Sequence, residues 1–140
     1  MFQRVYYQGE DNYVYEHSFS DSSSWTSSGT RLPFKTAPDS YLDAIVYDVS
    51  PGKNDPQIRI YYISEALHLE EYCLNPAGTR GWFKGADFND IAPNPLRETK
   101  VTALAWEGPE IRIYYQKTDL TLKEVVLTDG YGWVEGVGLK

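Results

Sequence analysis

The stretch Arg59-Ile60-Tyr61-Tyr62-Ile63 decides the fold, because nearly the same five residues occur twice more in the chain. The other copies lie at residues 4–8 (RVYYQ) and 112–116 (RIYYQ), and the three arginines are 55 and 53 residues apart. A fixed period of this length indicates a structural repeat in which each copy is one supersecondary unit.

Further elements recur at similar distances in each copy. A glutamate follows each arginine by 12 residues, and a tryptophan follows each glutamate by 9 or 11 residues; these are Glu16, Glu71, Glu124, Trp25, Trp82 and Trp133. Gly85 and Gly136 come three residues after their tryptophan, and Gly29 comes four after Trp25. An alanine-containing element appears twice, at 43–47 and 102–106. The repeat therefore has four short elements, rich in β-branched and aromatic residues.

Four strands per repeat of this length are typical of a β-propeller blade, so we expect an all-β protein of four-stranded antiparallel sheets. The alanine-containing strand suits the innermost position, followed outward by the arginine, glutamate and tryptophan strands. We expect one partial propeller domain over 1–140, with repeats at about 1–40, 41–97 and 98–140. Three blades do not close a ring, so the chain either dimerises into six blades or is part of a longer propeller.

The spacing also predicts how the arginine and glutamate strands pair. Directly opposed residues of a hairpin are equidistant from its turn. Arg4 and Glu16 have residue 10 as their midpoint, and the two other pairs are centred on residues 65 and 118. All three midpoints fall in turn-like segments, so we expect each arginine directly opposite its glutamate on one face of the sheet.

Composition excludes several classes of protein. Of 140 residues, 41% are hydrophobic and 24% charged, which excludes wholesale disorder. The net charge of −7 argues against nucleic acid or an anionic membrane as a partner. No apolar run approaches the ~20 residues of a membrane helix. Residues 1–4 lack the apolar region of a secretory signal, so we expect a cytoplasmic or non-classically released protein.

Neither a metal nor a cofactor is expected. The single cysteine, Cys73, cannot form an internal disulfide and is interpreted as a small core residue. His17 and His68 occupy different positions in their repeats, and no Asp/His cluster has the spacing of metal ligands.

The repeated Arg, Glu and Trp allow two interpretations. An arginine opposite a glutamate is an ordinary cross-strand ion pair, and one tryptophan per blade can be packing between blades. Exposed ion pairs contribute little stability, however, so stability alone does not require the same pair three times. The three residue types also suit a sugar: an indole stacks on the apolar face of a pyranose, while guanidinium and carboxylate bond its hydroxyls.

The R-[VI]-Y-Y strand, the glutamate 12 residues later, the W-x-x-G strand and the alanine-containing strand together resemble the fungal fucose-specific lectins. This resemblance implies a six-bladed β-propeller that binds L-fucose and fucosylated glycans between adjacent blades, without catalysis. Arginine and glutamate come from one blade and tryptophan from the next. A further residue, three positions after the glutamate and often aromatic, lines the pocket.

By this resemblance, the first site combines Arg4 and Glu16 with Trp82, and the second combines Arg59 and Glu71 with Trp133. The third combines Arg112 and Glu124 with Trp25 of another chain or of a closed ring. The lining residues are Phe19, Leu74 and Leu127.

Two other functions remain open from the sequence. A propeller that binds proteins without sugar specificity is the main alternative. A glycosidase is least expected, because the arginine beside each glutamate favours the ionised carboxylate, the wrong form for a general acid.

Overall fold

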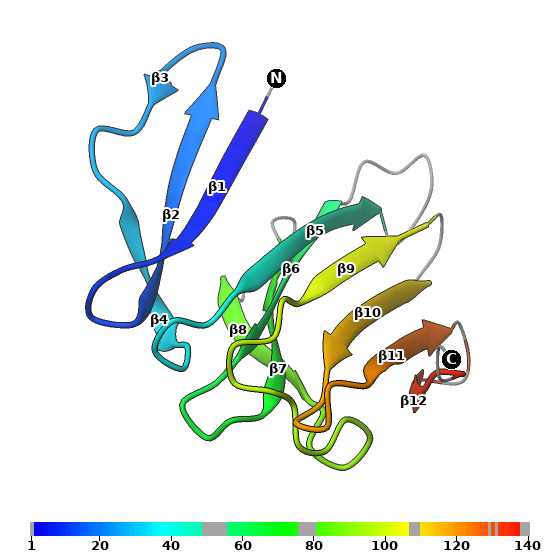
Figure 1. Cartoon of the computed structure of the whole chain (residues 1–140). Helices are drawn as coiled ribbons and strands as arrows, with labels where there is room; N and C mark the ends of the chain where they lie inside the picture. The colour runs from blue at the N-terminus through cyan, green and yellow to red at the C-terminus, as the bar shows by residue number, and fades with distance from the viewer. Residues whose placement is uncertain are drawn as a thin grey trace.

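The chain folds into three antiparallel β-sheets, each built from one repeat (Figure 1). The computed structural model describes residues 2–48, 56–75, 81–106, 110–128, 130 and 132–137. Its strands are β1 (Phe2–Gln8), β2 (Tyr13–Ser20), β3 (Ser24–Trp25), β4 (Thr30–Lys35), β5 (Leu42–Asp48), β6 (Pro56–Ile63), β7 (Leu69–Leu74), β8 (Trp82–Asp87), β9 (Thr102–Ala105), β10 (Ile111–Gln116), β11 (Leu122–Thr128) and β12 (Gly132–Glu135). The described part of the chain contains no helix long and apolar enough to cross a membrane.

Strand order in the second and third sheets confirms the sequence prediction. The orders are β5-β6-β7-β8 and β9-β10-β11-β12, so the alanine-containing strand leads and the tryptophan strand ends each sheet. The inner strands β5 and β9 lie side by side near the middle of the molecule (Figure 1). These sheets have the four-stranded form of propeller blades.

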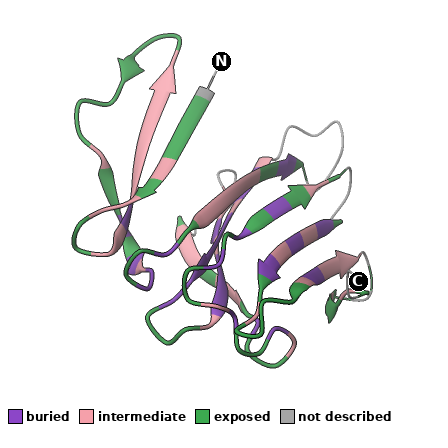
Figure 2. Ribbon diagram, viewed as in Figure 1, coloured by how far each residue is buried: buried purple, intermediate pink, exposed green. Residues whose placement is uncertain are grey.

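The first sheet differs from the other two at both of its edges. Its tryptophan element is split into β3 and β4, both of which pair with β2. Its arginine strand β1 pairs with β2 alone among the described residues, whereas β6 and β10 are paired on both sides. As a result β1 is largely exposed, while the equivalent strand β6 is largely buried (Figure 2).

The predicted hairpin register was wrong by two residues. Glu16 lies opposite Tyr6, not Arg4, and the other two glutamates likewise lie opposite the first tyrosine of their motif. The cause is a three-residue loop whose last residue has a left-handed conformation, at Asn12, Leu67 and Leu120, with φ of 63°, 60° and 66°. A leucine carries no sequence signal for that conformation. Since the shift is an even number of residues, arginine, tyrosine and glutamate still share one face.

Two apolar clusters join successive sheets. Alternate residues of β6 point in opposite directions, so Ile60 and Tyr62 face the first sheet, and Tyr61 and Ile63 face the third. The cluster at the first junction contains Val14, Leu32, Phe34, Ile60 and Tyr62. The cluster at the second junction contains Ala37, Tyr47, Tyr61, Ile63, Leu69, Phe88, Ala92, Val101, Ala103, Ile111, Ile113, Tyr115 and Val125.

Hydrogen bonds hold the sheets in place beside this packing. The Asp43 carboxylate on β5 accepts a bond of 2.8 Å from the Ala103 amide on β9. The Gln8 side chain on β1 donates to Thr36 Oγ1 and to the Ala37 carbonyl, in the segment that leads from the first sheet to the second. Each sheet is therefore anchored to the next by polar as well as apolar contacts.

Replacing Leu120 by asparagine should stabilise the protein. Leu120 is 66% exposed and has φ of 66°, and left-handed backbone costs a non-glycine residue about 1 kcal/mol, least for asparagine. Leu120→Asn should therefore raise the free energy of unfolding in urea by up to about 1 kcal/mol. The control Leu122→Asn, in extended β11, should give no gain; equal effects of both variants would refute the strain argument.

Candidate functional site

In each repeat, an arginine and a tyrosine of one strand lie beside the carboxylate of a single glutamate on the next strand. In the first sheet, Arg4 Nη1 and the Tyr6 hydroxyl donate to Glu16 Oε2 at 2.7 and 2.9 Å. In the third sheet, Arg112 and Tyr114 donate to Oε1 of Glu124 at 2.7 and 2.8 Å. The alternation of a strand explains this contact: arginine and tyrosine, two residues apart, point to the same face.

The second copy keeps the tyrosine bond, but its arginine forms a longer ion pair with the glutamate in place of a hydrogen bond. Tyr61 donates to Glu71 Oε1 at 2.9 Å, while Arg59 Nε lies 3.6 Å from the same oxygen. The Arg59 guanidinium donates instead to the Asn75 side chain at 3.1 Å and to the Ile58 carbonyl at 3.0 Å. This site therefore differs from the other two in its arginine.

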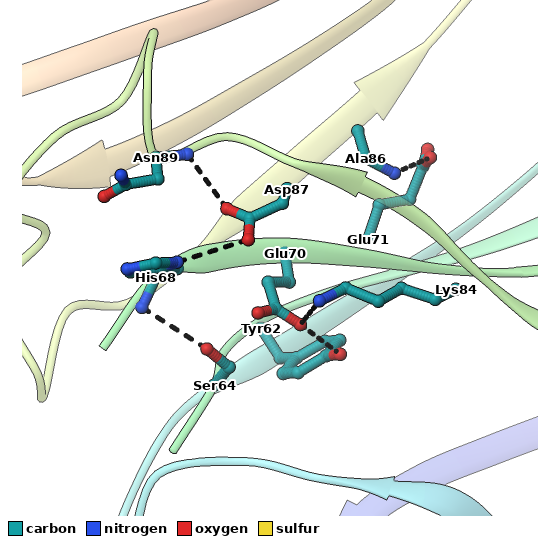
Figure 3. Close-up of polar contacts among 9 residues, drawn as sticks. All are labelled: Tyr62, Ser64, His68, Glu70, Glu71, Lys84, Ala86, Asp87 and Asn89. Atoms are coloured by element: carbon teal, nitrogen blue, oxygen red, sulfur yellow. Dashed lines mark hydrogen bonds and ion pairs between the residues drawn. The ribbon is translucent and has the colours of Figure 1, made fainter. Parts of the chain in front are cut away.

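The two oxygens of each glutamate have different surroundings. In Glu16 and Glu124, arginine and tyrosine bind the same oxygen, and no group in the described segments donates to the other. Glu71 Oε2 accepts a bond from the Ala86 amide at 3.2 Å (Figure 3). An acceptor is thus available to a ligand at two copies, and is already used at the third.

The glycine of the W-x-x-G motif makes room for the carboxylate. A β-carbon on Gly85 would overlap the carboxylate of Glu71, and one on Gly136 would overlap that of Glu124. Gly29 does not have this role, because it faces Tyr7 and Tyr15, and Thr30 is the residue opposite Glu16. The equivalence predicted for Gly29 was therefore wrong, since the split of the first tryptophan element shifts the register.

Two of the tryptophans reach across a junction between sheets. The Trp82 ring, on β8 of the second sheet, meets the Tyr6 ring of the first sheet edge-on at 5.9 Å. The Trp133 ring, on β12 of the third sheet, meets the Tyr61 ring of the second sheet at 6.2 Å. Each of these tyrosines also donates to its glutamate, so the tryptophan of one sheet stands beside the triad of the preceding sheet.

The predicted lining residues lie directly across a strand pair from these tryptophans. The register pairs Phe19 with Trp25, Leu74 with Trp82 and Leu127 with Trp133. In the first sheet the two rings touch at 5.5 Å, and Trp25 is 45% exposed.

Strands β10 and β11, which carry the third triad, lie at the opposite end of the molecule from β3, which contains Trp25 (Figure 1). Arg112 lies over a different indole, that of Trp106 at the end of the inner strand, at 5.8 Å. Within one copy of the chain, Arg112 and Glu124 are therefore not brought together with the tryptophan that the sequence assigned to them.

The electrostatics of the third triad favour its charged state. Burial raises the pKa of Glu124, but the hydrogen bonds from Arg112 and Tyr114 outweigh this effect and hold the pKa below its ordinary value. The bond to Glu124 also raises the pKa of both Arg112 and Tyr114. The carboxylate is therefore an acceptor throughout the neutral range.

A separate polar cluster contains residues that are able to bind metals. His68, Glu70 and Asp87 bring one ligand atom each within 4.8 Å of one another (Figure 3). However, Glu70 already accepts from the Tyr62 hydroxyl at 3.0 Å and pairs with Lys84 at 3.1 Å. The ammonium group opposes a cation there, so the cluster is best explained as an ion-pair network. Sequence spacing missed it because Asp87 comes from another strand.

The tyrosine of the triad was not predicted from the sequence. Tyr6, Tyr61 and Tyr114 recur two residues after each arginine, a repeat that marked them as readily as the arginines. The expected register placed arginine, not tyrosine, opposite the glutamate, and so hid this role. Cys73 is buried as expected, and burial raises the pKa of its thiol.

The chain is similar to fucose-specific lectins, which confirms the resemblance seen in its motifs. A fucose-specific lectin of Aspergillus fumigatus is 28% identical over 132 residues, which are 93% of this chain and 40% of the lectin. No protein-family model matches the chain. The similar curated proteins are lectins, which supports the expectation that the chain is not an enzyme.

Solved structures give the same result. The Aleuria aurantia lectin, a six-bladed β-propeller, is 29% identical with a TM-score of 0.70, and the match covers 98% of this chain and 43% of that one. The SapL1 lectin, solved with α-methyl fucoside, is 28% identical with a TM-score of 0.73, covering 96% of this chain and 42% of that one. The chain is thus a partial propeller that spans less than half of these lectins.

Removing the Tyr114 hydroxyl should raise the pKa of Glu124, because the bond that it donates stabilises the carboxylate. Carboxyl NMR signals followed through a pH titration give this value. Tyr114→Phe should move the Glu124 midpoint upward, and Tyr115→Phe, on the opposite face of β10, should not. Because the folded-state pKa is lowered, this carboxylate stabilises the fold above its unfolded pKa, and the stabilisation is lost as pH falls through the folded pKa. An unchanged midpoint in Tyr114→Phe would contradict the assignment.

Proposed function

We propose that the chain binds L-fucose and fucosylated glycans at the junctions between successive sheets. The observation that carries this proposal is the repeated triad of arginine, tyrosine and glutamate, beside a tryptophan of the following sheet at both junctions. The similarity to fucose-specific lectins supports it, and so does the α-methyl fucoside bound in the SapL1 structure.

The chemistry of the triad suits a small sugar. A guanidinium donates in a fixed plane and a carboxylate accepts, so together they match hydroxyls that both donate and accept. At Glu16, the oxygen that takes neither Arg4 nor Tyr6 is the proposed acceptor for a sugar hydroxyl. The half-buried Trp82 ring supplies an apolar surface for C–H groups, and in fucose the methyl group adds to that surface.

Turnover is not expected at these sites. A glycosidase needs a carboxylic acid with a raised pKa beside a second carboxylate. Here the carboxylate of each triad accepts from an arginine or a tyrosine, and Glu124 has a lowered pKa. These contacts favour binding without proton transfer.

The two intrachain sites should differ in affinity. At the first, Arg4 is 36% exposed and donates to Glu16 at 2.7 Å. At the second, Arg59 is 12% exposed and donates to Asn75 and Ile58, and both oxygens of Glu71 are engaged. A sugar at the second site has to replace some of these bonds, so we propose weaker binding there.

Alanine substitution of each tryptophan, in variants that retain one intrachain site, tests which tryptophan belongs to which site. Two backgrounds each retain one intrachain site: Arg59→Ala with Arg112→Ala keeps the Arg4 site, and Arg4→Ala with Arg112→Ala keeps the Arg59 site. In titration calorimetry with L-fucose, Trp82→Ala should weaken the first background about tenfold or more, as loss of ~1.4 kcal/mol of stacking and packing predicts.

Trp133→Ala is the matched control and should have the reverse pattern. It should weaken the Arg59 background and leave the Arg4 background unchanged. If each tryptophan instead affected the site of its own sheet, the assignment of sites between sheets would be wrong. No fucose binding in the unsubstituted chain would overturn the function itself.

We further propose that the third site is completed by a second copy of the chain. Apolar side chains are exposed on both outer faces: Val5 and Tyr7 on β1 are 50% and 40% exposed, and Leu104 and Trp106 of the third sheet are 47% and 49% exposed. Two three-blade arcs related by a twofold axis cover these faces and form six blades. In that ring, Trp25 of one copy stands beside Arg112 and Glu124 of the other.

Sedimentation and fucose stoichiometry test the dimer together. We expect a dimer at micromolar concentration, with one more site per chain than the two intrachain ones. Trp25→Ala should remove that extra site, while Val134→Ala, which replaces another exposed apolar residue, should keep it. A monomer of 16.0 kDa that binds fucose would contradict the dimer and leave the intrachain sites standing.

A further inference from the structure

The residue four positions after each triad glutamate differs among the three repeats: it is Ser20, Asn75 or Thr128. In the second repeat, the half-buried Asn75 follows directly after β7, and its side-chain oxygen accepts a hydrogen bond of 3.1 Å from Arg59 Nη1. Asn75 therefore competes with Glu71 for the arginine. The hydroxyl residues at this position in the other two repeats offer no amide.

The arginine of the second repeat presents a different nitrogen to its glutamate. Arg4 and Arg112 each direct Nη1 at the carboxylate, at 2.7 Å. Arg59 gives Nη1 to two neutral oxygens, those of the Asn75 side chain and the Ile58 carbonyl, and only its Nε faces Glu71, at 3.6 Å. The nitrogen that bonds to the carboxylate in the other repeats is thus already occupied here.

The other neighbours of Arg59 do not account for this difference. The Ile58 carbonyl belongs to the main chain, and a carbonyl precedes the arginine in every repeat. An aromatic ring lies 5.5 Å from the Arg59 guanidinium, but a ring lies at 5.8 Å in the third repeat too, where the arginine keeps its bond to glutamate. Gln57 Oε1 is 3.4 Å from Nη2, which is long for a hydrogen bond. Asn75 is the contact that remains.

From these contacts we propose that Asn75 is a positioning residue that keeps Arg59 from its hydrogen bond with Glu71 and so lowers the affinity of the second site for fucose. This inference rests on the proposed function and names the residue that makes the two intrachain sites unequal. An amide four positions after the glutamate weakens a site, and a hydroxyl at that position leaves the arginine with its glutamate.

The number of hydrogens on Nη1 explains the effect on binding. Each Nη group of a guanidinium carries two hydrogens. Both are used at Arg59 Nη1, whereas Nη1 of Arg4 and of Arg112 donates within the described segments to glutamate alone. A sugar hydroxyl that accepts from Nη1 at the second site has to displace the Asn75 oxygen. One hydrogen bond of ordinary strength corresponds to about a tenfold change in affinity.

Enclosure of the arginine is the competing explanation, because Arg59 is 12% exposed and Arg4 is 36% exposed. Exchange of the residue at this position between the two sites separates the explanations, since it moves the amide and leaves the strands around each arginine in place.

Removal of the amide should strengthen the second site. In the background that keeps the Arg59 site, Asn75→Ser should tighten L-fucose binding about tenfold in titration calorimetry. Asn89→Ser makes the same change at an exposed asparagine outside the site and should have no effect. A crystal structure of Asn75→Ser without sugar should show Arg59 donating to Glu71 at about 3 Å.

Addition of the amide should weaken the first site. In the background that keeps the Arg4 site, Ser20→Asn should weaken L-fucose binding about tenfold, while Ser28→Asn, at an exposed serine, should not. Far-UV circular dichroism verifies that the variants are folded. Fucose affinities unchanged by Asn75→Ser and Ser20→Asn would overturn the inference and leave the proposed function standing. If no variant bound fucose, the proposed function would fail, and the crystal structure alone would decide whether Asn75 positions Arg59.

Discussion

A buried carboxylate is the constraint on which the second and third sheets depend. Glu71 and Glu124 are 6% and 5% exposed, and a charge removed from water to this degree has to be matched by donors. Tyrosine and arginine supply them from the neighbouring strand, which fixes that strand's face. The tryptophan strand supplies space through Gly85 and Gly136, where any β-carbon would overlap the carboxylate. In these two sheets, one buried charge thus accounts both for the R-x-Y spacing and for the W-x-x-G motif.

The sequence was sufficient to predict the strand order, because four spaced elements recurred with distinct residue types. It was not sufficient for the register, which depends on one loop residue with a left-handed conformation. Asparagine, at position 12, favours this conformation, but leucine, at positions 67 and 120, does not, so the sequence gives no sign of it there. The same limit applies to Gly29, since no sequence pattern indicates that the tryptophan element of the first sheet is split into β3 and β4. Contacts between sheets, such as that of Asp43 with Ala103, could not be predicted either, because a local sequence pattern does not identify a partner 60 residues away.

The tryptophans show how packing and binding share residues in this fold. Trp133 meets Phe88 edge-on at 4.8 Å as well as Tyr61, and Trp82 stacks on Tyr72. These contacts hold each indole at its junction before any ligand arrives, which lowers the entropy cost of binding. The alternative explanation from sequence, packing between blades, is therefore correct for these rings and compatible with a sugar-binding role.

The exposed fraction of each arginine side chain shows how completely its triad is enclosed by neighbouring strands and sheets. Arg59 has an inner strand on one side and a following sheet in front, and it is 12% exposed. In the described part of the chain, Arg4 has no inner strand beside it and Arg112 has no following sheet in front of it, and their side chains are 36% and 43% exposed. Only the enclosed arginine makes its hydrogen bonds away from its glutamate: Arg59 donates to the Asn75 side chain, while its Nε stays 3.6 Å from Glu71 Oε1. Ser20 and Thr128 stand at the positions that correspond to Asn75 in the other repeats and offer no amide. Further enclosure, as in the proposed dimer, would therefore bury Arg112 without releasing it from Glu124. The sites that close on assembly would then keep a paired arginine and carboxylate directed at the ligand, and Arg59 would remain the exception because of Asn75.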